Sequence, residues 1–321
     1  MGKIAVLFPG QGSQYVGMGQ QLLADRPELA GMYRAAAEIL GYDLAALTAR
    51  GPEEELRRTR HTQPALFVAS LAAWQWLRLG LAESGLEAWD PDYAAGHSLG
   101  EYSAVVAAGC LAFSAGLALV AKRAQWMEED AQAQPGAMAA VLGLEAAVVQ
   151  DIAAEVSAGG EVLVAANFNG PGQVVVSGTP AGVERAGALA RERGARRVVP
   201  LAVGGAFHSP LMARAAARMR AELARQSFAD PRFPVLSNVR GLPASSAAEV
   251  SEGLAAQMES PVRWQQSVEW LVAAGVDTFI EVGPGQVLTG LVRKCAPQAR
   301  TLHVEDPQSG QLTLDFLKGA L

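Results

Sequence analysis

The chain is poor in cysteine and histidine. Only two cysteines and four histidines occur among its 321 residues. Cys110 and Cys295 lie far apart in apolar patterns of helical spacing, and we expect both to be buried, reduced thiols. The sequence suggests neither a metal site nor a resident cofactor.

A long apolar run at the start of the chain and a basic run anywhere in it are missing as well. The apolar start of the chain, MGKIAVLFP, is too short for a signal peptide or a membrane span and is typical of a buried strand. The net charge of -6 and the lack of a Lys/Arg-rich run argue against a nucleic-acid partner. We therefore expect a soluble, cytoplasmic protein that binds neither nucleic acid nor a membrane.

Apolar residues and glycines, by contrast, are abundant. Half of the residues are hydrophobic and 34 are glycine, enough for a large core with many tight backbone passages. Strand-like segments alternate with helical ones, such as the long helix expected from Pro64 to Leu79. This alternation predicts an α/β fold whose mainly parallel sheet is covered on both faces.

Residues 137–201 have a different rhythm. They follow the order strand, helix, strand, strand, helix, strand, which is that of a ferredoxin-like module (βαββαβ). We expect an α/β-hydrolase-like large subdomain of residues 1–132 and 204–321, with residues 133–203 inserted as a small subdomain. The loosely composed segment 241–246 is expected to be a connector. An insertion of this kind leaves a crevice between two lobes, where a ligand can bind.

The stretch GHSLG has the spacing G-x-S-x-G around Ser98. A serine at a sharp strand-to-helix turn exposes its hydroxyl, and Gly96 and Gly100 allow strand and helix to approach closely. The free N–H groups of the following helix can bind a developing oxyanion. Ser98 is therefore a candidate nucleophile, the alternative being a glycine-bracketed turn with a serine that caps a helix.

A serine nucleophile needs a base, and four histidines are available. His97 adjoins Ser98 and points to the other face of an extended strand, while His61 and His303 lie in polar or strand-like segments. By elimination His208, which follows glycines just before a helix, is the best base, unless it is a capping or core histidine. Between Ser98 and His208 no acid stands at a strand end in a glycine-rich turn, which counts against a hydrolase triad.

Seven motifs carry a resemblance to a known family. In chain order they are FPGQGSQYVGMG, TQPALFVAS, GHSLGEYSA, NFNGPGQVVVSG, GAFHS, SPVRW and EVGPGQVLTGL. Together they resemble the malonyl-CoA:acyl carrier protein transacylases of fatty acid synthesis, which are related to polyketide synthase acyltransferase domains. The resemblance spans nearly the whole chain.

The resemblance implies a Ser-His dyad. Ser98 of GHSLGEY would be the acylated nucleophile and His208 of GAFHS its base, held by a main-chain carbonyl rather than an aspartate. The segment ahead of SPVRW would supply that carbonyl, and Gln257 there matches the family glutamine. The missing carboxylate noted above agrees with this arrangement.

Other motifs imply further roles. The GQGSQ loop resembles the family's oxyanion partner, so that the backbone N–H groups of Gln11 and Leu99 would bind the tetrahedral oxygen. A phosphate-binding glycine loop is the alternative, but the P-loop lysine and a full G-x-G-x-x-G are missing. Gln63 of TQPA resembles a residue that lines the family's pocket.

The resemblance also implies substrate contacts. Arg123, taken alone a surface arginine on an amphipathic helix, matches the arginine that grips the malonyl carboxylate, while Lys122 would point elsewhere. Asn167 and Asn169 match residues that line the CoA or phosphopantetheine approach, or else form a turn. Phe207 matches a phenylalanine that accompanies malonyl selectivity in polyketide synthase domains, or else packs in the core.

These residues imply a ping-pong transfer. Malonyl-CoA would acylate Ser98, and the phosphopantetheine thiol of acyl carrier protein would then take the malonyl group. A thioester hydrolase and a non-catalytic carrier-binding module are the competing functions. The carrier is acidic, so a local basic face is expected, with candidates Arg191, Arg193, Arg214 and Arg218.

Overall fold

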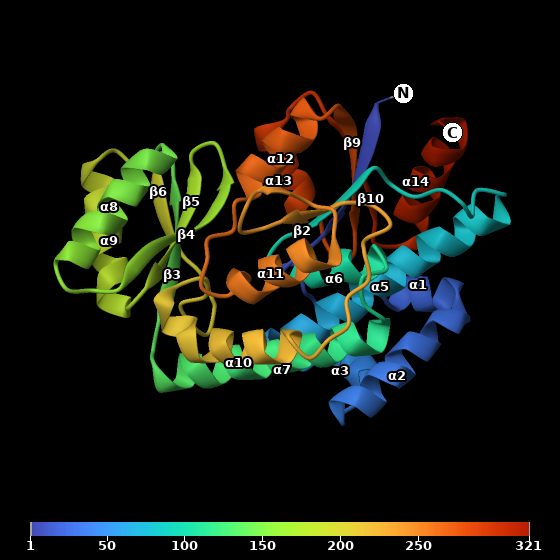
Figure 1. Ribbon diagram of the computed structural model, residues 1–321, viewed down its shortest axis with the longest axis horizontal. Coiled ribbons are helices and arrows are strands. Elements are labelled where there is room, and N and C mark those ends of the chain that lie inside the picture. Colours follow the sequence, from blue (N-terminus) through green and yellow to red (C-terminus); the bar gives the residue numbers. More distant parts are fainter. Residues whose placement is uncertain (1, 321) are drawn as a thin grey trace.

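A six-stranded, mainly parallel sheet forms the centre of the larger part of the molecule (Figure 1). The computed structural model describes residues 2–320. The strand order is β10-β9-β1-β2-β7-β8, and of these pairings only β7 with β8 is antiparallel. The strands are β1 (Lys3–Phe8), β2 (Tyr93–Gly96), β7 (Val235–Ser237), β8 (Leu242–Ala244), β9 (Val276–Val282) and β10 (Arg300–Val304).

Helices cover this sheet on both faces, as the sequence predicts. Along β1, Ile4 and Val6 pack into the core formed with α5, α6 and α7, whereas Ala5 and Leu7 face α12 and α13. This alternation follows from the two-residue period of a strand. The helices around the sheet are α1 (Gln20–Asp25), α2 (Ala30–Leu40), α3 (Leu44–Arg50), α4 (Glu53–Arg57), α5 (Thr59–Glu83), α6 (Leu99–Ala107), α7 (Phe113–Ala133), α10 (Ala213–Leu223), α11 (Ala247–Gln257), α12 (Trp264–Ala273), α13 (Val287–Cys295) and α14 (Pro307–Ala320).

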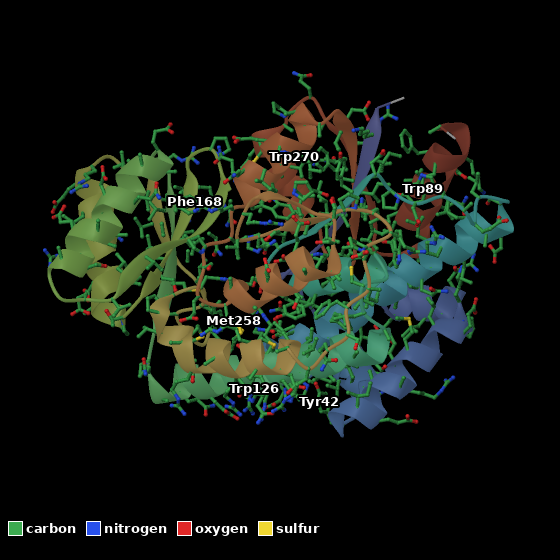
Figure 2. The ribbon with its side chains drawn as sticks, viewed as in Figure 1. Tyr42, Trp89, Trp126, Phe168, Met258 and Trp270 are labelled. Carbon is green, nitrogen blue, oxygen red and sulfur yellow. The ribbon has the colours of Figure 1, made fainter. Side chains whose placement is uncertain are left out.

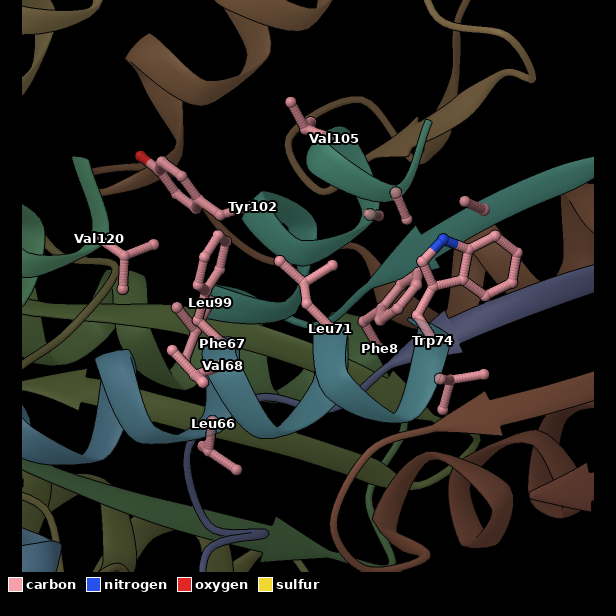
Figure 3. Close-up of a cluster of buried hydrophobic side chains, with 14 of the residues drawn as sticks. Phe8, Leu66, Phe67, Val68, Leu71, Trp74, Leu99, Tyr102, Val105 and Val120 are labelled. Atoms are coloured by element: carbon pink, nitrogen blue, oxygen red, sulfur yellow. The ribbon is translucent and has the colours of Figure 1, made fainter. Parts of the chain in front are cut away.

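Helix α5 is the central helix of the larger core. Figure 3 shows its side chains, Leu71 and Trp74 among them, packed against Phe8 of β1 and Leu99 of α6. By length and composition α5 would also be apolar enough to cross a membrane, but 78% of its most apolar 18-residue window is buried inside the protein. Its hydrophobicity is therefore accounted for by burial in the core.

A second, four-stranded antiparallel sheet lies beside the first (Figure 1). Its strand order is β4-β5-β3-β6, and its helices α8 and α9 share a separate hydrophobic core with the sheet. The sequence predicted this order of elements, which are β3 (Ala137–Leu142), α8 (Ala146–Ala158), β4 (Leu163–Gly170), β5 (Gln173–Gly178), α9 (Pro180–Glu192) and β6 (Arg197–Pro200).

The two parts of the molecule meet in two places. The chain leaves the larger part at Gly136 and returns beside it at Ala206, so closely that a Cβ on Gly136 would lie 2.5 Å from the Ala206 Cβ. Strand β4, whose Phe168 is labelled in Figure 2, also exchanges backbone hydrogen bonds of 2.8–2.9 Å with Val262, ahead of α12. These contacts fix the position of β4 next to the larger sheet.

Several details differ from the sequence-based expectations. Helix α5 begins at Thr59 and contains Pro64, where a start was expected, and the connector at 241–246 holds the short strand β8. Helix α14, at the end of the chain, was not predicted. Both thiols are free, but Cys110 lies in the connection between α6 and α7, and Cys295 is only partly buried.

Candidate active site

Ser98 occupies a sharp turn between β2 and α6. Its backbone has φ 51° and ψ -102°, a conformation that residues with a side chain rarely adopt. A Cβ on Gly96 would lie 1.9 Å from the Gly100 carbonyl carbon, and one on Gly100 would lie 2.0 Å from the Phe8 oxygen. The two glycines are therefore required by close backbone approach, as the G-x-S-x-G spacing predicts.

Asn238, just after β7, holds this turn in place. Its side-chain Oδ1 accepts the Ser98 N–H at 2.7 Å, and its Nδ2 donates to the Gly96 carbonyl at 2.7 Å. The Asn238 side-chain amide therefore bonds to the backbone at Ser98 and at Gly96. These two hydrogen bonds offset part of the cost of the unusual Ser98 backbone.

His208 lies within hydrogen-bonding distance of the nucleophile. The Ser98 Oγ and the His208 Nε2 are 2.8 Å apart. On the other side of the ring, Nδ1 lies 3.0 Å from the Gln257 carbonyl oxygen and 3.2 Å from that of Ser260. Because carbonyl oxygens only accept, Nδ1 carries the ring proton and Nε2 is free to accept the hydroxyl proton of Ser98.

The environment of His208 keeps the imidazole neutral. Burial and the nearby positive charge of Arg123 lower the pKa of His208 from its ordinary value to about 3. A neutral imidazole can accept a proton, and its conjugate acid, once formed in this site, readily gives that proton up again. The side chain is only 3% exposed, so water has little access to it.

Arg123 of α7 is a buried cation whose acceptors are neutral. It is 1% exposed, and its Nη1 donates to the Gln63 Oε1 at 2.7 Å. Its Nη2 donates to the Ser98 Oγ at 3.0 Å and to the Gln257 Oε1 at 2.9 Å. Burial lowers the pKa of the guanidinium, which still stays protonated in a protein. Within residues 2–320 no carboxylate lies within 4.0 Å of this desolvated cation, although the charge of the buried Glu101 acts on it from farther away, so the site favours an anionic ligand at the guanidinium.

A cavity of about 90 Å³ lies directly over these groups. Residues of the larger part of the molecule line it together with Met138 and Asn167 of the antiparallel sheet. The site therefore lies between the two sheets, where the sequence placed a crevice. The residues around it are Gln11, Gln63, His97, Ser98, Leu99, Arg123, Met127, Met138, Asn167, Leu201, Val203, Phe207 and His208.

The other predicted site residues fall into two groups. Gln11, Leu99, Asn167 and Phe207 line the cavity, and Leu99 is the first residue of α6, so that its N–H has no acceptor within the helix. Asn169 instead accepts a hydrogen bond of 2.8 Å from the His97 Nε2 through its Oδ1. Gln257, the remaining predicted residue, lies behind Arg123 rather than in the cavity wall. Both asparagines belong to β4 rather than to a turn.

The remaining histidines and Lys122 lie where the sequence placed them. His97 points away from the hydroxyl of Ser98 toward Asn169, and His61 interacts with the Glu55 carbonyl through Nδ1 at 2.9 Å. His303 lies 3.1 Å from the Gln286 amide. Lys122 forms an ion pair with Glu222 on the far side of α7.

Sequence reasoning missed two polar side chains of this site, Asn238 and Glu101, as well as the apolar lining residues Met127, Met138, Leu201 and Val203. Asn238 ends the run VLSN, and a polar residue at the carboxyl end of a parallel strand is a usual place for site residues. Glu101 belongs to the GHSLGEY motif, where a charge within a run of small apolar residues was the available signal. It is 3% exposed and contacts both Asn238 and Gln257.

Neither a metal-ligand cluster nor the hollow on α5 offers comparable chemistry within residues 2–320. Over residues 2–320 no three His, Cys, Asp or Glu side chains are grouped to hold a metal ion. A larger hollow of about 460 Å³ lies on α5 around Trp74 and Arg78, but Arg78 is already paired there with Asp90 at 3.3 Å. The small cavity over Ser98 is therefore the candidate active site.

The chain resembles known proteins over almost its whole length. Residues 6–308 match the acyl transferase domain family. The chain is 44% identical over 318 residues to the malonyl CoA-acyl carrier protein transacylase of Bacillus subtilis (strain 168), covering 99% of this chain and 98% of the relative. The chain therefore belongs to the malonyl CoA-acyl carrier protein transacylase family, as the resemblance of its motifs indicated.

Solved structures agree with this assignment. A crystal structure of an acyl carrier protein S-malonyltransferase from Vibrio cholerae superposes with a TM-score of 0.91 at 42% identity, over 97% of this chain and 99% of that one. A type II polyketide synthase acyl carrier protein in complex with its malonyl-transacylase gives a TM-score of 0.91 at 40% identity, over 98% and 99% of the chains. The mixed α/β architecture with one mainly parallel and one antiparallel sheet is thus the family fold.

Proposed function

We propose that the protein transfers the malonyl group from malonyl-CoA to the phosphopantetheine thiol of an acyl carrier protein, through a malonyl ester on Ser98. One observation carries the proposal. The Ser98 Oγ lies 2.8 Å from a neutral histidine and 3.0 Å from a buried guanidinium that, among residues 2–320, has no carboxylate within 4.0 Å. A nucleophile and an anion-binding group therefore share one cavity, and the family to which the chain belongs supports malonyl as the acyl group.

The first half-reaction makes the ester. His208 Nε2 takes the proton of Ser98 as Oγ attacks the thioester carbonyl, and the N–H groups of Gln11 and Leu99 stabilise the oxyanion. The tetrahedral intermediate collapses with cleavage of the carbon–sulfur bond, and the departing CoA thiolate takes the proton from His208. The ester and free CoA are the products.

The second half-reaction reverses these steps with a different thiol. The phosphopantetheine thiol of the carrier gives its proton to His208 and attacks the ester carbonyl, and Ser98 leaves with that proton. The Ser-His dyad needs no carboxylate, because the carbonyls of Gln257 and Ser260 already fix the ring orientation. Phosphopantetheine arrives on the carrier, so the enzyme itself uses no cofactor.

Arg123 selects the acyl group in this proposal. The malonyl carboxylate brings an anion to a guanidinium whose hydrogen-bond acceptors in the protein are neutral, and two parallel N–H bonds match a carboxylate. Gln63 and Gln257 hold the guanidinium in place, and Asn167 and Phe207 line the rest of the pocket. Asn169 supports the approach to the site by fixing His97.

The same proposal covers the organisation of the chain. We assign residues 1–132 and 204–321 to an α/β-hydrolase-like subdomain, supported by the strand–serine–helix turn at Ser98. Residues 133–203 form a ferredoxin-like subdomain, supported by the order of elements and the strand order β4-β5-β3-β6. The partners of the whole protein are malonyl-CoA and an acyl carrier protein of fatty acid or polyketide synthesis. The protein acts in the cytoplasm.

Mass spectrometry of the protein after mixing with malonyl-CoA tests the proposal. A malonyl adduct is expected on the peptide that contains Ser98, and adding carrier protein should move it to the carrier. Ser98→Ala should lack the adduct and lose several orders of magnitude in transfer. An adduct on the alanine variant would refute the assignment of Ser98, and the complete lack of an adduct would favour a carrier-binding module.

A further inference from the structure

Glu101 is a buried carboxylate that joins two chain segments at the active site. It lies in the first turn of α6, three residues after Ser98, and is 3% exposed. Its Oε1 accepts the backbone N–H of Asn238 at 3.3 Å, and its Oε2 accepts the Gln257 Nε2 at 2.6 Å. Each oxygen thus holds a donor from a different segment, one after β7 and one in α11.

The contact with Glu101 fixes which way the Gln257 amide faces. Its Nε2 donates to Glu101 and, at 2.8 Å, to the Ser98 carbonyl. This leaves Oε1 directed at the Arg123 guanidinium, 2.9 Å away. The reversed amide would place an oxygen against the carboxylate and an NH₂ group against the arginine, both repulsive. The Gln257 backbone carbonyl also accepts from His208.

We propose that Glu101 is a positioning residue for the acyl transfer: its carboxylate orients Gln257 and Asn238, and through them Arg123 and Ser98. This inference rests on the proposed function, because it gives Glu101 a part in the acylation of Ser98. A carboxylate near a helix N-terminus also stabilises the helix. That simpler role would leave the orientation of the Arg123 guanidinium unaffected, so experiments can separate the two roles.

The ionised form of Glu101 is the one that fits both donors. A protonated carboxyl would direct its own O–H toward one of two N–H groups and lose that hydrogen bond. Burial raises the pKa of Glu101 to about 7, although its hydrogen bonds and the charges of Arg123 and Arg240 act to lower it. The neighbouring Tyr102, whose pKa is raised to about 12, stays neutral.

A specific pH dependence follows. His208, with a pKa of about 3, remains a neutral base well below neutrality. As the pH falls through about 7, Glu101 takes up a proton and the orientation of Gln257 is lost. The rate of Ser98 malonylation in the enzyme–substrate complex should therefore fall with an apparent pKa at or above 7, because the bound malonyl anion also disfavours the carboxylate.

Rapid-quench measurement of a single turnover of the full chain, at saturating malonyl-CoA and across this pH range, tests the proposal. In the Glu101→Gln variant, Ser98 should be malonylated about ten- to hundredfold more slowly than in the wild type above pH 7. The malonylation rate of this variant should not change as the pH passes through 7. Its rate with acetyl-CoA, which lacks the carboxylate, should fall less. Glu101→Asp should keep the change of rate near pH 7, since it keeps a titratable group.

Glu281→Gln is the matched control. Glu281 is also a fully buried carboxylate that accepts two backbone N–H groups, those of Leu288 and Thr289, and burial raises its pKa too. It caps α13, outside the site. This variant should lose stability at most, and keep both the pH profile and the malonyl-to-acetyl ratio of the wild type.

Three results would overturn the proposal or its basis in distinguishable ways. A folded Glu101→Gln variant with the wild-type rate, pH profile and acyl ratio would refute the role of Glu101. Should that variant fail to fold, a wild-type malonylation rate that is flat through pH 7 would refute it equally. The lack of any Ser98 adduct in the wild type would instead refute the proposed function.

Discussion

Two non-glycine residues have positive φ angles among residues 2–320, and both belong to the proposed dyad. Ser98 has φ 51° and His208 has φ 57°. Side chains rarely occupy this region, and such conformations persist only where the surroundings over-determine them. The hydrogen bond to Asn238 holds Ser98 in this conformation, and hydrogen bonds to the carbonyls of Gln257 and Ser260 hold His208. The unusual backbone brings Oγ and Nε2 within 2.8 Å.

Replacing Arg123 tests how the acyl group is selected. Arg123→Ala should lower the rate of malonyl transfer by roughly one to two decades, which corresponds to a loss of about 1.5–3 kcal/mol of transition-state stabilisation. The rate of acetyl transfer should stay the same or rise. The physical reason is that only malonyl carries the carboxylate that the guanidinium binds. Lys122→Ala is the control, because its side chain pairs with Glu222 away from the site. Equal losses of malonyl and acetyl rates for Arg123→Ala would make Arg123 a structural residue.

Phe207 tests the steric limit of the pocket. It lines the cavity directly before His208 and is 5% exposed, and we expect its ring to occupy the space that an α-methyl branch would need. Wild type should prefer malonyl-CoA over methylmalonyl-CoA by about 1–3 kcal/mol, and Phe207→Ser should narrow that ratio. Competition between the two substrates measures the ratio independently of stability. An unchanged ratio in a folded variant would show that the ring only packs the core.

At the level of elements, the tight contact of β1, β2 and α6 determines where the nucleophile lies. Gly100→Ala would place a Cβ 2.0 Å from the Phe8 oxygen, a backbone atom that cannot move cheaply. The free energy of unfolding should fall by about 1–3 kcal/mol, and Ser98 acylation should fall as well. Chemical denaturation and the malonylation rate measure the two effects.

Gly290→Ala in α13 serves as the control for that change. Its Cβ would meet nothing within 4 Å and the position is exposed, so alanine should stabilise the helix by about 0.5–1 kcal/mol. A Gly100→Ala variant that behaves like Gly290→Ala would contradict the close approach at the turn.

Local patterns in the sequence predicted some elements well and others poorly. The turn at Ser98 and the order of elements from β3 to β6 were predictable, because spacing and periodicity are local signals. Helix α5 begins five residues ahead of Pro64, where proline suggested a start, because Thr59, Thr62 and Gln63 are buried by neighbouring elements.

The roles of Asn238 and Glu101 could not be predicted for a different reason. Asn238 contacts Ser98 across 140 positions, and Glu101 contacts Gln257 across 156 positions. Such hydrogen bonds exist only once the sheet has brought β7 and α11 beside α6. Motif matching found Gln257 but not the carboxylate that orients its amide.

The distribution of charge over the whole molecule determines where an acidic carrier protein can bind. The net charge is -6, and two of the four candidates for the basic face are already paired: Arg193 with Glu155, and Arg218 with Glu129 at 2.5 Å. Arg214 lies 3.9 Å from Asp130. Within residues 2–320 no carboxylate lies within 4.0 Å of Arg191, which therefore contributes the least compensated charge of the four.

Salt should then weaken carrier binding more than substrate binding. The KM for an acidic carrier protein should rise as ionic strength increases, because added ions screen charges beyond about 10 Å at 0.1 M salt. The KM for malonyl-CoA serves as the internal reference and should change less, since its carboxylate binds a buried guanidinium. Salt-independent carrier kinetics would count against a basic docking face.

The fate of the malonyl ester on Ser98 distinguishes transfer to a carrier from hydrolysis. Malonylated enzyme, freed of malonyl-CoA, is mixed either with carrier protein that bears phosphopantetheine or with buffer alone, and the adduct on Ser98 is followed by mass spectrometry. The proposed function predicts rapid loss to the carrier, with malonyl-carrier formed in equal amount, and slow loss in buffer. Equally fast loss in both, with free malonate as the product, would contradict it and identify a thioester hydrolase.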